Sequence, residues 1–145
     1  MPAPTPWTIR HSRYLHTDRW IRLRADSCET ANGTIIEPYY VLEYPDYAAA
    51  LALTEDHHAV LINIYRHGLR QTLLELPGGC VDKDEKPAET VRRELLEETG
   101  YDFPTVEKVT EISPNPSMHN NLMHGFLATG GRKVAEPQPE AGESL

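Results

Sequence analysis

Apolar and polar residues alternate along several short stretches in the first half of the chain, which is typical of half-buried β-strands. Residues 21–26 read IRLRAD and show this alternation. Asn32 and Gly33 follow them, and both residue types tolerate the positive φ that a hairpin turn requires. The pattern therefore predicts a hairpin that joins residues 21–26 to a second strand at residues 35–44. Two more strands are expected at residues 48–54 and 59–65.

The second half of the chain contains a strand, a loop and then a helical pattern. Residues 73–76 predict a short strand that runs into Pro77-Gly78-Gly79 and a loop as far as Lys86. A helix is expected at residues 87–99, because proline suits the first helical position and glycine suits the left-handed residue just past the end. Ala88, Val91 and Leu95 form an apolar stripe that would pack this helix on a sheet.

Two further strands are expected after the helix, at residues 106–112 and 122–128. Residues 113–121 (SPNPSMHNN) predict a loop, because prolines and asparagines break regular structure. From Thr129 onward the chain is polar and shows no periodicity, so no regular element is expected there. His57 and His58 are adjacent in a polar turn, and neighbouring strand residues point to opposite faces, which argues against a shared metal ion.

Length and charge narrow the possibilities. With 145 residues, the chain is expected to form one domain over residues 1–145. A net charge of −8 without a basic cluster argues against binding to nucleic acid. The two cysteines show no disulfide or metal-binding spacing, and no apolar N-terminal run predicts a signal peptide. The longest apolar stretch, residues 48–53, is too short to span a membrane, so a cytoplasmic protein without a membrane partner is expected.

Three glutamates lie close together on the predicted helix. Glu94, Glu97 and Glu98 fall within about 100° of one another on one helical face. Each like-charged pair costs roughly 0.2–0.5 kcal/mol, and a divalent cation would remove that cost. Hard ions such as Mg²⁺ prefer oxygen ligands and often bind phosphates at the same time. The three carboxylates therefore indicate a site for a metal ion and a phosphate.

The glutamates belong to a longer pattern, which reads Gly79-x5-Glu85-x7-Arg93-Glu94-Leu95-x-Glu97-Glu98-x-Gly100-Tyr101. It matches the Nudix box at every fixed position, and the chain resembles the Nudix hydrolases, which cleave nucleoside diphosphates linked to another moiety. The alternative is a solvated acidic helix face with a glycine cap. Glu85, Arg93 and both glycines in register favour the functional interpretation.

The resemblance implies an α/β (α+β) Nudix fold, with a mixed, mainly antiparallel sheet sandwiched between helices. Glu94, Glu97 and Glu98 correspond to the family's metal-binding glutamates, with Glu97 and Glu98 closest to the chemistry. A backbone carbonyl of Gly78 or Gly79 is expected to supply another oxygen ligand, since small residues let the main chain approach an ion.

Two other box residues are expected to hold the loop. Glu85 and Arg93 correspond to an ion pair that orients the loop around the metal site. The implied cofactor is Mg²⁺ (or Mn²⁺), with two or more ions, and the implied reaction is metal-assisted attack of water on a pyrophosphate.

Segments outside the box resemble the ADP-ribose pyrophosphatase and nucleoside-diphosphate-sugar hydrolase branch. They are Ile64-Tyr65-Arg66, the run from Leu74 to Gly79, and Pro116, sixteen residues beyond Gly100. By this resemblance, Arg66 contacts a substrate phosphate, where its planar fork suits paired oxygens. Glu75 is a candidate for contact with the metal or the substrate. The alternative for both residues is an exposed strand end.

One departure from the branch concerns the substrate. Asn120-Asn121 stands where the branch has an acidic pair, and asparagine cannot serve as an anionic base. This favours a nucleoside diphosphate sugar other than ADP-ribose, with Asn120 and Asn121 as candidate substrate contacts. Further candidates are His119 for a substrate contact and Trp20, Tyr39 and Tyr40 for base stacking, whereas His124 is interpreted as a packed strand residue.

The C-terminal residues resemble the acidic loop that precedes one more strand and a C-terminal helix in that branch. The chain is therefore expected to stop short of the family's final strand and helix. Glu143 is then the candidate general base, with Glu140 as the reserve. The alternative is an acidic terminus without a function. The branch also implies a homodimer that forms through the N-terminal strands.

The expected function is Mg²⁺-dependent hydrolysis of the pyrophosphate in an ADP-ribose-like compound or another nucleoside diphosphate sugar. The products would be a nucleoside monophosphate and a sugar phosphate. Two alternatives stay open at this point. One is a hydrolase of dinucleoside polyphosphates or nucleoside triphosphates, and the other is a non-catalytic nucleotide-sensing Nudix module.

Overall fold

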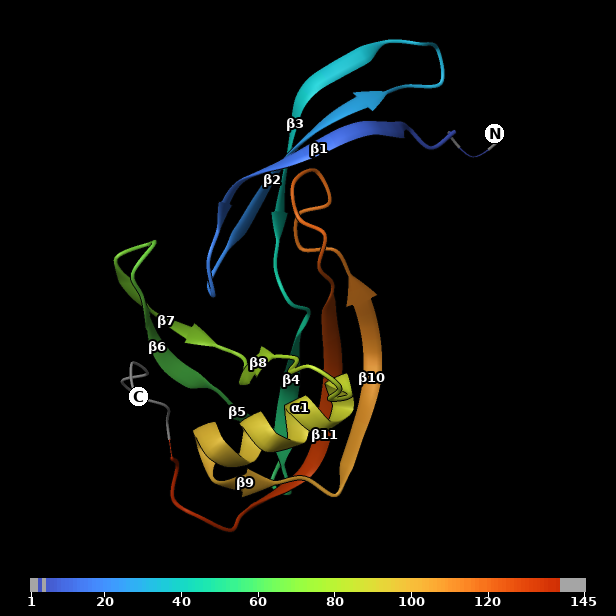
Figure 1. Cartoon of the computed structure of the whole chain (residues 1–145). Coiled ribbons are helices and arrows are strands. Elements are labelled where there is room, and N and C mark those ends of the chain that lie inside the picture. Colours follow the sequence, from blue (N-terminus) through green and yellow to red (C-terminus); the bar gives the residue numbers. More distant parts are fainter. Residues whose placement is uncertain (1–2, 4, 139–145) are drawn as a thin grey trace. The chain divides into compact units, whose positions relative to one another are not determined.

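The computed structural model describes residue 3 and residues 5–138, and these divide into two compact units (Figure 1). Unit 1 contains the chain up to Tyr44 together with Ser113–Asn121. Unit 2 begins at Pro45, runs to Ile112 and resumes at Leu122. Within the described residues, no helix is both long enough and apolar enough to cross a lipid bilayer.

Unit 1 is a three-stranded antiparallel sheet in the order β1-β2-β3. Its strands are β1 (Thr8–Thr17), β2 (Arg22–Glu29) and β3 (Ile35–Glu43). Gly33, with a φ of 81°, lies in the turn between β2 and β3, as its sequence predicts. The loop at residues 113–121 contacts the end of β3, where the Leu42 N–H donates to the Met118 carbonyl at 2.7 Å.

Unit 2 is built on a mixed sheet in the order β10-β11-β4-β5. The central pair, β4 (Tyr47–Thr54) and β11 (Met123–Lys133), is parallel, and β10 (Thr105–Ile112) runs antiparallel to β11. Three short strands complete the sheet: β5 (Ala59–Val60), β8 (Gly78–Cys80) beside β4, and β9 (Tyr101–Asp102) beside β11. β6 (Ile62–Arg66) and β7 (Gln71–Glu75) form a separate antiparallel hairpin.

One helical run covers a face of this sheet. α1 (Pro87–Glu94) continues without a break into the π-helical turn η1 (Leu95–Thr99). Glu89 caps its start by accepting the Lys86 N–H at 3.1 Å. Gly100 ends it in the left-handed conformation with a φ of 73°. Within the described residues, this helical run packs on one face of the mixed sheet of unit 2.

The core of unit 2 is formed by small side chains on the sheet and larger ones on the helix. Ala48, Ala50 and Ala52 alternate along β4 and are fully buried. They belong to the same buried cluster as Val91 and Leu95 of the helix. Because alanine side chains are short, the helix backbone approaches the sheet closely, and this brings its carboxylates near β8.

The chain after β11 ties down the end of the helical run. The N–H groups of Val134 and Ala135 both donate to the Gly100 carbonyl, at 2.9 and 3.1 Å. The Gln138 N–H donates to the Glu97 carbonyl at 2.7 Å. These bonds satisfy carbonyls that have no partner inside the helix.

The sequence pattern missed several strands. β1 was not predicted, because all ten of its residues are exposed and it has no apolar face that would alternate with a polar one. Residues 59–65 form two strands that belong to different sheets, β5 and β6, where one strand was expected. β8 was expected as loop, and β11 extends past Thr129 to Lys133, because pairing with β4 and β9 stabilises segments that lack a hydrophobic pattern.

Candidate functional site

The candidate site in unit 2 begins with two glycines of β8 that lie against the sheet and the helix. A Cβ atom on Gly78 would lie 2.2 Å from the Ala48 carbonyl oxygen. A Cβ atom on Gly79 would lie 2.1 Å from Glu94 Oε1. Any larger residue would therefore displace a backbone carbonyl at the first position or the Glu94 carboxylate at the second.

Two of the predicted ligand carboxylates converge on these glycines. Glu98 is only 4% exposed, and its Oε2 accepts the Gly78 N–H at 2.8 Å. Glu94 Oε1 lies against Gly79, as its contact with the Cβ position shows. The strand–loop–helix segment thus brings together two carboxylates and a stretch of backbone without side chains.

The third carboxylate, Glu97, points to Arg93 and is 43% exposed. Arg93 uses one nitrogen, Nη1, to contact Glu94 Oε1 at 2.8 Å and Glu97 Oε2 at 3.1 Å. Its other two nitrogens contact Glu85, with Nε 3.1 Å from Oε1 and Nη2 3.2 Å from Oε2. A single guanidinium therefore contacts three carboxylates, and one of these contacts is the predicted Glu85–Arg93 pair.

These contacts change the protonation equilibria of both partners. The Arg93 hydrogen bonds, followed by one from Thr90, lower the pKa of Glu85 from 4.5 to about 2. Glu85 raises the pKa of Arg93 in turn, with Glu94 and Glu97 contributing, against the opposing effect of burial. Both groups are ionised at neutral pH, so the ion pair is intact under physiological conditions.

The donor set fits a hard divalent cation, although the ligands are not gathered around one point. Glu94 and Glu98 present carboxylate oxygens next to a glycine backbone that can approach an ion. Among residues 5–138, no three His, Cys, Asp or Glu side chains form a ready metal cluster. The Glu97 carboxylate contacts Arg93.

Arg66 and Glu75, both predicted to lie near the substrate, contact each other. They stand on adjacent strands of the β6–β7 hairpin, where Arg66 Nη2 lies 2.8 Å from Glu75 Oε2 and Nε lies 3.1 Å from Oε1. This forked pair lowers the pKa of Glu75. A phosphate that binds Arg66 would compete with the Glu75 carboxylate for the same nitrogens.

The remaining predicted contacts lie in unit 1 or outside the described residues. Asn120 accepts the Tyr44 N–H at 3.1 Å, and Asn121 is buried. Tyr39 donates to the Ser117 carbonyl at 2.6 Å, and Trp20 is 71% exposed. Glu143 and its reserve Glu140 lie outside the described residues.

One polar contact near the box loop has no signal in the sequence. Asp46, the residue before β4, accepts the Leu122 N–H at 2.8 Å and contacts His124 Nε2 at 3.1 Å through its carboxylate. Its backbone carbonyl accepts the Val81 N–H at 2.8 Å. His124 is buried, as predicted for a packed strand residue, and its other ring nitrogen lies 3.3 Å from Glu111. Asp46 thus fastens the box loop to β11.

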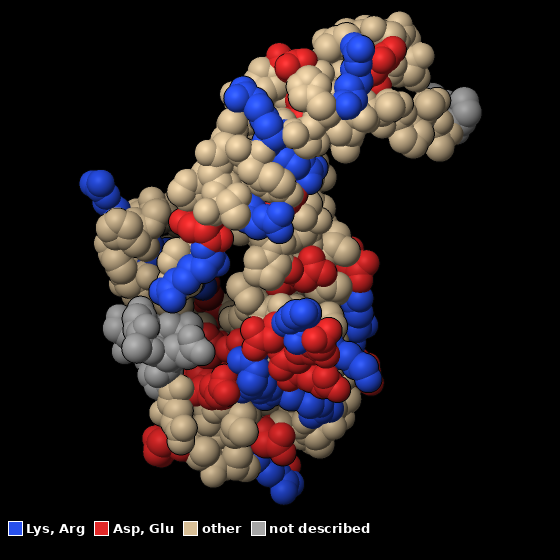
Figure 2. Space-filling model, in the orientation of Figure 1, with Lys and Arg blue, Asp and Glu red and all other residues tan. Residues whose placement is uncertain are grey.

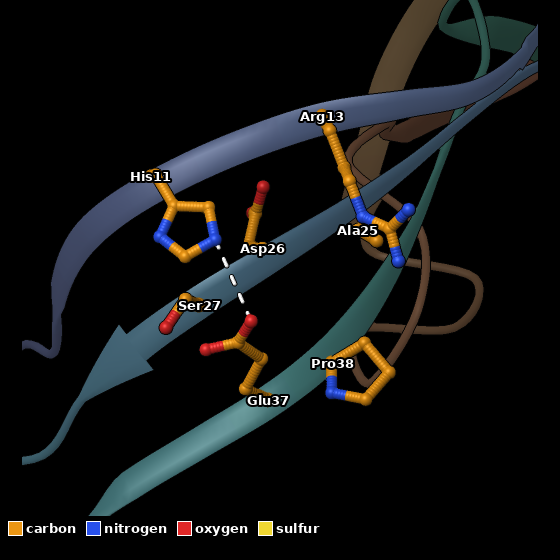
Figure 3. A pocket seen from close by; sticks show the side chains of 7 residues that line it. All are labelled: His11, Arg13, Ala25, Asp26, Ser27, Glu37 and Pro38. Atoms are coloured by element: carbon orange, nitrogen blue, oxygen red, sulfur yellow. Dashed lines mark ion pairs between the residues drawn. The ribbon is translucent and has the colours of Figure 1, made fainter.

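Charged side chains of both signs gather over the helix of unit 2 on the face seen in Figure 2. A separate cleft of unit 1 is shown in Figure 3, between His11 and Arg13 of β1, Asp26 and Ser27 of β2, and Glu37 of β3. His11 Nε2 lies 3.5 Å from Glu37 Oε1 across it. None of its lining residues belongs to the box.

Comparison with protein-family models divides the chain near the boundary between the units. Residues 7–42 match the nucleoside diphosphate sugar hydrolase N-terminal domain, and residues 43–145 match the NUDIX domain. The second match covers most of the chain and includes every residue of the glutamate–arginine site described above.

Relatives of the chain include an ADP-ribose pyrophosphatase and a GDP-mannose pyrophosphatase. An ADP-ribose pyrophosphatase of Bacillus subtilis (strain 168) is 32% identical over 108 residues, which are 74% of this chain and 58% of that protein. A GDP-mannose pyrophosphatase of Salmonella typhimurium is 41% identical over 126 residues, which are 84% of this chain and 61% of that protein. The chain thus spans about three fifths of the length of these relatives.

A solved structure supports the fold. The crystal structure of an ADP compounds hydrolase matches with a TM-score of 0.83 and 21% identity, over 99% of this chain and 78% of that one. At this identity the match speaks for the fold alone.

The low pKa of Glu85 predicts how its contribution to stability varies with pH. Because the folded pKa of about 2 lies below the ordinary 4.5, ionised Glu85 stabilises the folded protein above about pH 4.5. This stabilisation is lost as the pH falls towards 2. Glu85→Gln should therefore lower the free energy of unfolding at pH 7, and the difference from wild type should shrink below pH 4.5 and disappear only below about pH 2. Urea unfolding of both proteins over this pH range measures the difference.

Glu107→Gln on the exposed side of β10 is the matched control for that measurement. A deficit in Glu85→Gln that stays constant from pH 7 to pH 2 would contradict the assigned ion pair.

Proposed function

The chain belongs to the Nudix family, and we propose that it hydrolyses the pyrophosphate bond of a nucleoside diphosphate sugar or an ADP-ribose-like compound. The products are a nucleoside monophosphate and a sugar phosphate. One observation carries the proposal: Glu94 and Glu98 converge on the Gly78–Gly79 backbone, and Arg93 compensates the charge beside them. This arrangement suits a divalent cation with a bound diphosphate.

Glu94, Glu97, Glu98 and a carbonyl of Gly78 or Gly79 would hold the Mg²⁺ or Mn²⁺ ions. When bound, such ions neutralise phosphate oxygens and lower the pKa of the attacking water. Glu97 would have to leave Arg93 to join the other two ligands, which its exposure permits. Arg93 would keep Glu85 and remain beside the site as a fixed positive charge.

Glu98→Gln tests the metal site. A glutamine oxygen can still accept the Gly78 N–H, so the fold should persist, but one negative charge is lost from the ligand set. We expect hydrolysis to fall by about 100-fold or more, and Mn²⁺ affinity to fall with it. Product release from a nucleoside diphosphate sugar and Mn²⁺ titration are the two measurements.

Glu107→Gln again serves as the control, because it makes the same substitution on the exposed side of β10. Wild-type turnover in Glu98→Gln would show that the catalytic carboxylates are wrongly assigned.

Several observations support an internal diphosphate as the substrate. The family model over residues 7–42 carries a nucleoside diphosphate sugar hydrolase description, and relatives named after both ADP-ribose and GDP-mannose match the chain. Arg66 offers a planar fork for one phosphate group once Glu75 releases it. Asn120 and Asn121, neutral where an acidic pair was expected, would suit contacts to sugar hydroxyls.

A hydrolysis panel tests this choice. Purified protein with Mg²⁺ should cleave ADP-ribose or a UDP- or GDP-sugar with a higher kcat/KM than any nucleoside triphosphate or dinucleoside polyphosphate. The physical reason is that the site would bind a diphosphate that links a nucleoside to a sugar. Preference for triphosphates would overturn the substrate class, and binding without any turnover would instead indicate a nucleotide-sensing module.

A second copy of this chain is the partner we propose for unit 1. β1 is an edge strand with ten exposed residues, and several large apolar side chains of this unit face solvent. These are Trp7, Ile9, Tyr14, Leu15, Trp20 and Ile35. An exposed edge strand with apolar side chains favours association with another strand or sheet.

Glu143 is our candidate for the general base. The last described contact in that direction is the Gln138 N–H bond to the Glu97 carbonyl, which anchors the chain beside the site. Glu143 is five residues beyond Gln138 in the sequence, and a five-residue segment spans at most about 17 Å. Glu143→Gln should lower kcat by about 100-fold or more with little change in Mn²⁺ affinity. An unchanged kcat would exclude Glu143 as the general base, and Glu140→Gln would then be the next variant to measure.

A further inference from the structure

Thr90 is a polar residue in an unusual place. It lies on α1 with 0% of its surface exposed. A threonine inside a helix commonly donates its hydroxyl proton to the carbonyl four residues earlier. Here Oγ1 lies 2.8 Å from Glu85 Oε2 and 3.4 Å from the Lys86 carbonyl. Because a hydroxyl has one proton, the nearer and ionised acceptor takes it.

The bond connects the box loop to the helix. Glu85 stands in the loop between β8 and α1, whereas Thr90 is part of α1 and cannot move without it. Two Arg93 nitrogens and the Thr90 hydroxyl surround the Glu85 carboxylate. Thr90 is the most buried donor of this set, so it fixes the position of the carboxylate relative to the helix.

Glu85 in turn fixes the plane of the Arg93 guanidinium. Two of its nitrogens bind Glu85, and the third binds Glu94 and Glu97. Because the guanidinium is rigid and planar, a shift at Glu85 rotates the whole group. The rotation displaces Nη1, the nitrogen that contacts the carboxylates of Glu94 and Glu97. The Thr90 hydroxyl is therefore connected to two proposed metal ligands through a chain of direct contacts.

We propose that Thr90 is a positioning residue for metal binding: its buried hydroxyl holds Glu85, which orients Arg93 and thereby the carboxylate of Glu94. The inference rests on the proposed metal site and adds a residue outside the fixed positions of the box. Removal of the hydroxyl should allow the side chains of Glu85 and Arg93 to adopt several orientations. Metal binding would then have to order these side chains, and this would lower the affinity for the metal.

The test measures the affinity of the full chain for Mn²⁺, with free and bound ion distinguished by electron paramagnetic resonance. Thr90→Val keeps the shape of the side chain and removes the hydroxyl, and it should weaken Mn²⁺ binding by about 10-fold. Thr90→Ser keeps the hydroxyl and should retain most of the affinity. Thr90→Ala carries the same test if Thr90→Val does not fold.

Thr54→Val is the matched control. Thr54 is also a buried threonine whose hydroxyl donates to a carboxylate, Asp56 Oδ1 at 2.5 Å. It is the last residue of β4, whereas Gly78 and Gly79 pair with the start of that strand. The Mn²⁺ affinity of Thr54→Val should equal that of wild type.

A second readout needs no metal. The Arg93 Nε–H group donates to Glu85, so its exchange with solvent in ¹⁵N nuclear magnetic resonance reports on that contact. Exchange should be faster in Thr90→Val and unchanged in Thr90→Ser and Thr54→Val. In a Glu85→Gln background, Thr90→Val should have a much smaller effect on Mn²⁺ affinity, because both changes weaken one chain of contacts.

The possible failures are distinct. One outcome is that Thr90→Val has the Mn²⁺ affinity and the Arg93 exchange rate of wild type, while Glu98→Gln binds Mn²⁺ weakly. That outcome would overturn the role of Thr90 and leave the proposed function intact. Absence of Mn²⁺ binding by wild type would overturn the proposed function and this inference together.

Discussion

Arg93 is the residue on which the arrangement of the candidate site depends. Four glutamates of the box would repel one another if no positive charge stood among them. The Arg93 guanidinium contacts three of them directly, at 2.8 to 3.2 Å. The fourth, Glu98, is stabilised by the Gly78 N–H. This compensation allows a dense group of carboxylates to exist on a folded helix before any cation binds.

The second constraint is the short distance between helix and sheet. Ala48, Ala50 and Ala52 on β4 let the helix approach, and Gly78 and Gly79 on β8 leave room for carboxylates and carbonyls. The same small residues that pack the core therefore also create the site. Packing of Val91 and Leu95 into this core fixes the helix, and the direction of Glu94 and Glu98 follows from it.

The two units differ in how much they bury. In unit 2, a continuous apolar cluster joins the sheet and the helix. In unit 1, the buried residues of the sheet are a short run of β2, Ala25 to Cys28, and two of them are polar. A three-stranded sheet with so little buried apolar surface gains little stability from its own core. This contrast supports our proposals that the catalytic site lies in unit 2 and that unit 1 contacts a second copy of the chain.

Much of the candidate site is determined by the sequence alone, because the box residues are local. Glu94 and Glu98 lie in one helical run, and helical periodicity with the flanking Pro87 and Gly100 is enough to place their side chains on one face. Glu85 lies in the adjoining loop, and its pair with Arg93 was expected from the family resemblance. Hairpin β2–β3 and strands β4 and β10 could be predicted for the same reason, since each carries its pattern within a few residues.

Tertiary structure decided what no local pattern encodes. The exposed strand β1 and the short strand β8 exist because distant strands pair with them. The Arg66–Glu75 pair depends on the register of the β6–β7 hairpin, and the Thr90–Glu85 bond depends on how the box loop closes over the helix. Glu97 could be placed on the acidic face from its spacing, but only the folded arrangement shows that Arg93 holds it. A side chain with several partners in reach is positioned by the balance of those contacts, and that balance is a property of the assembled structure.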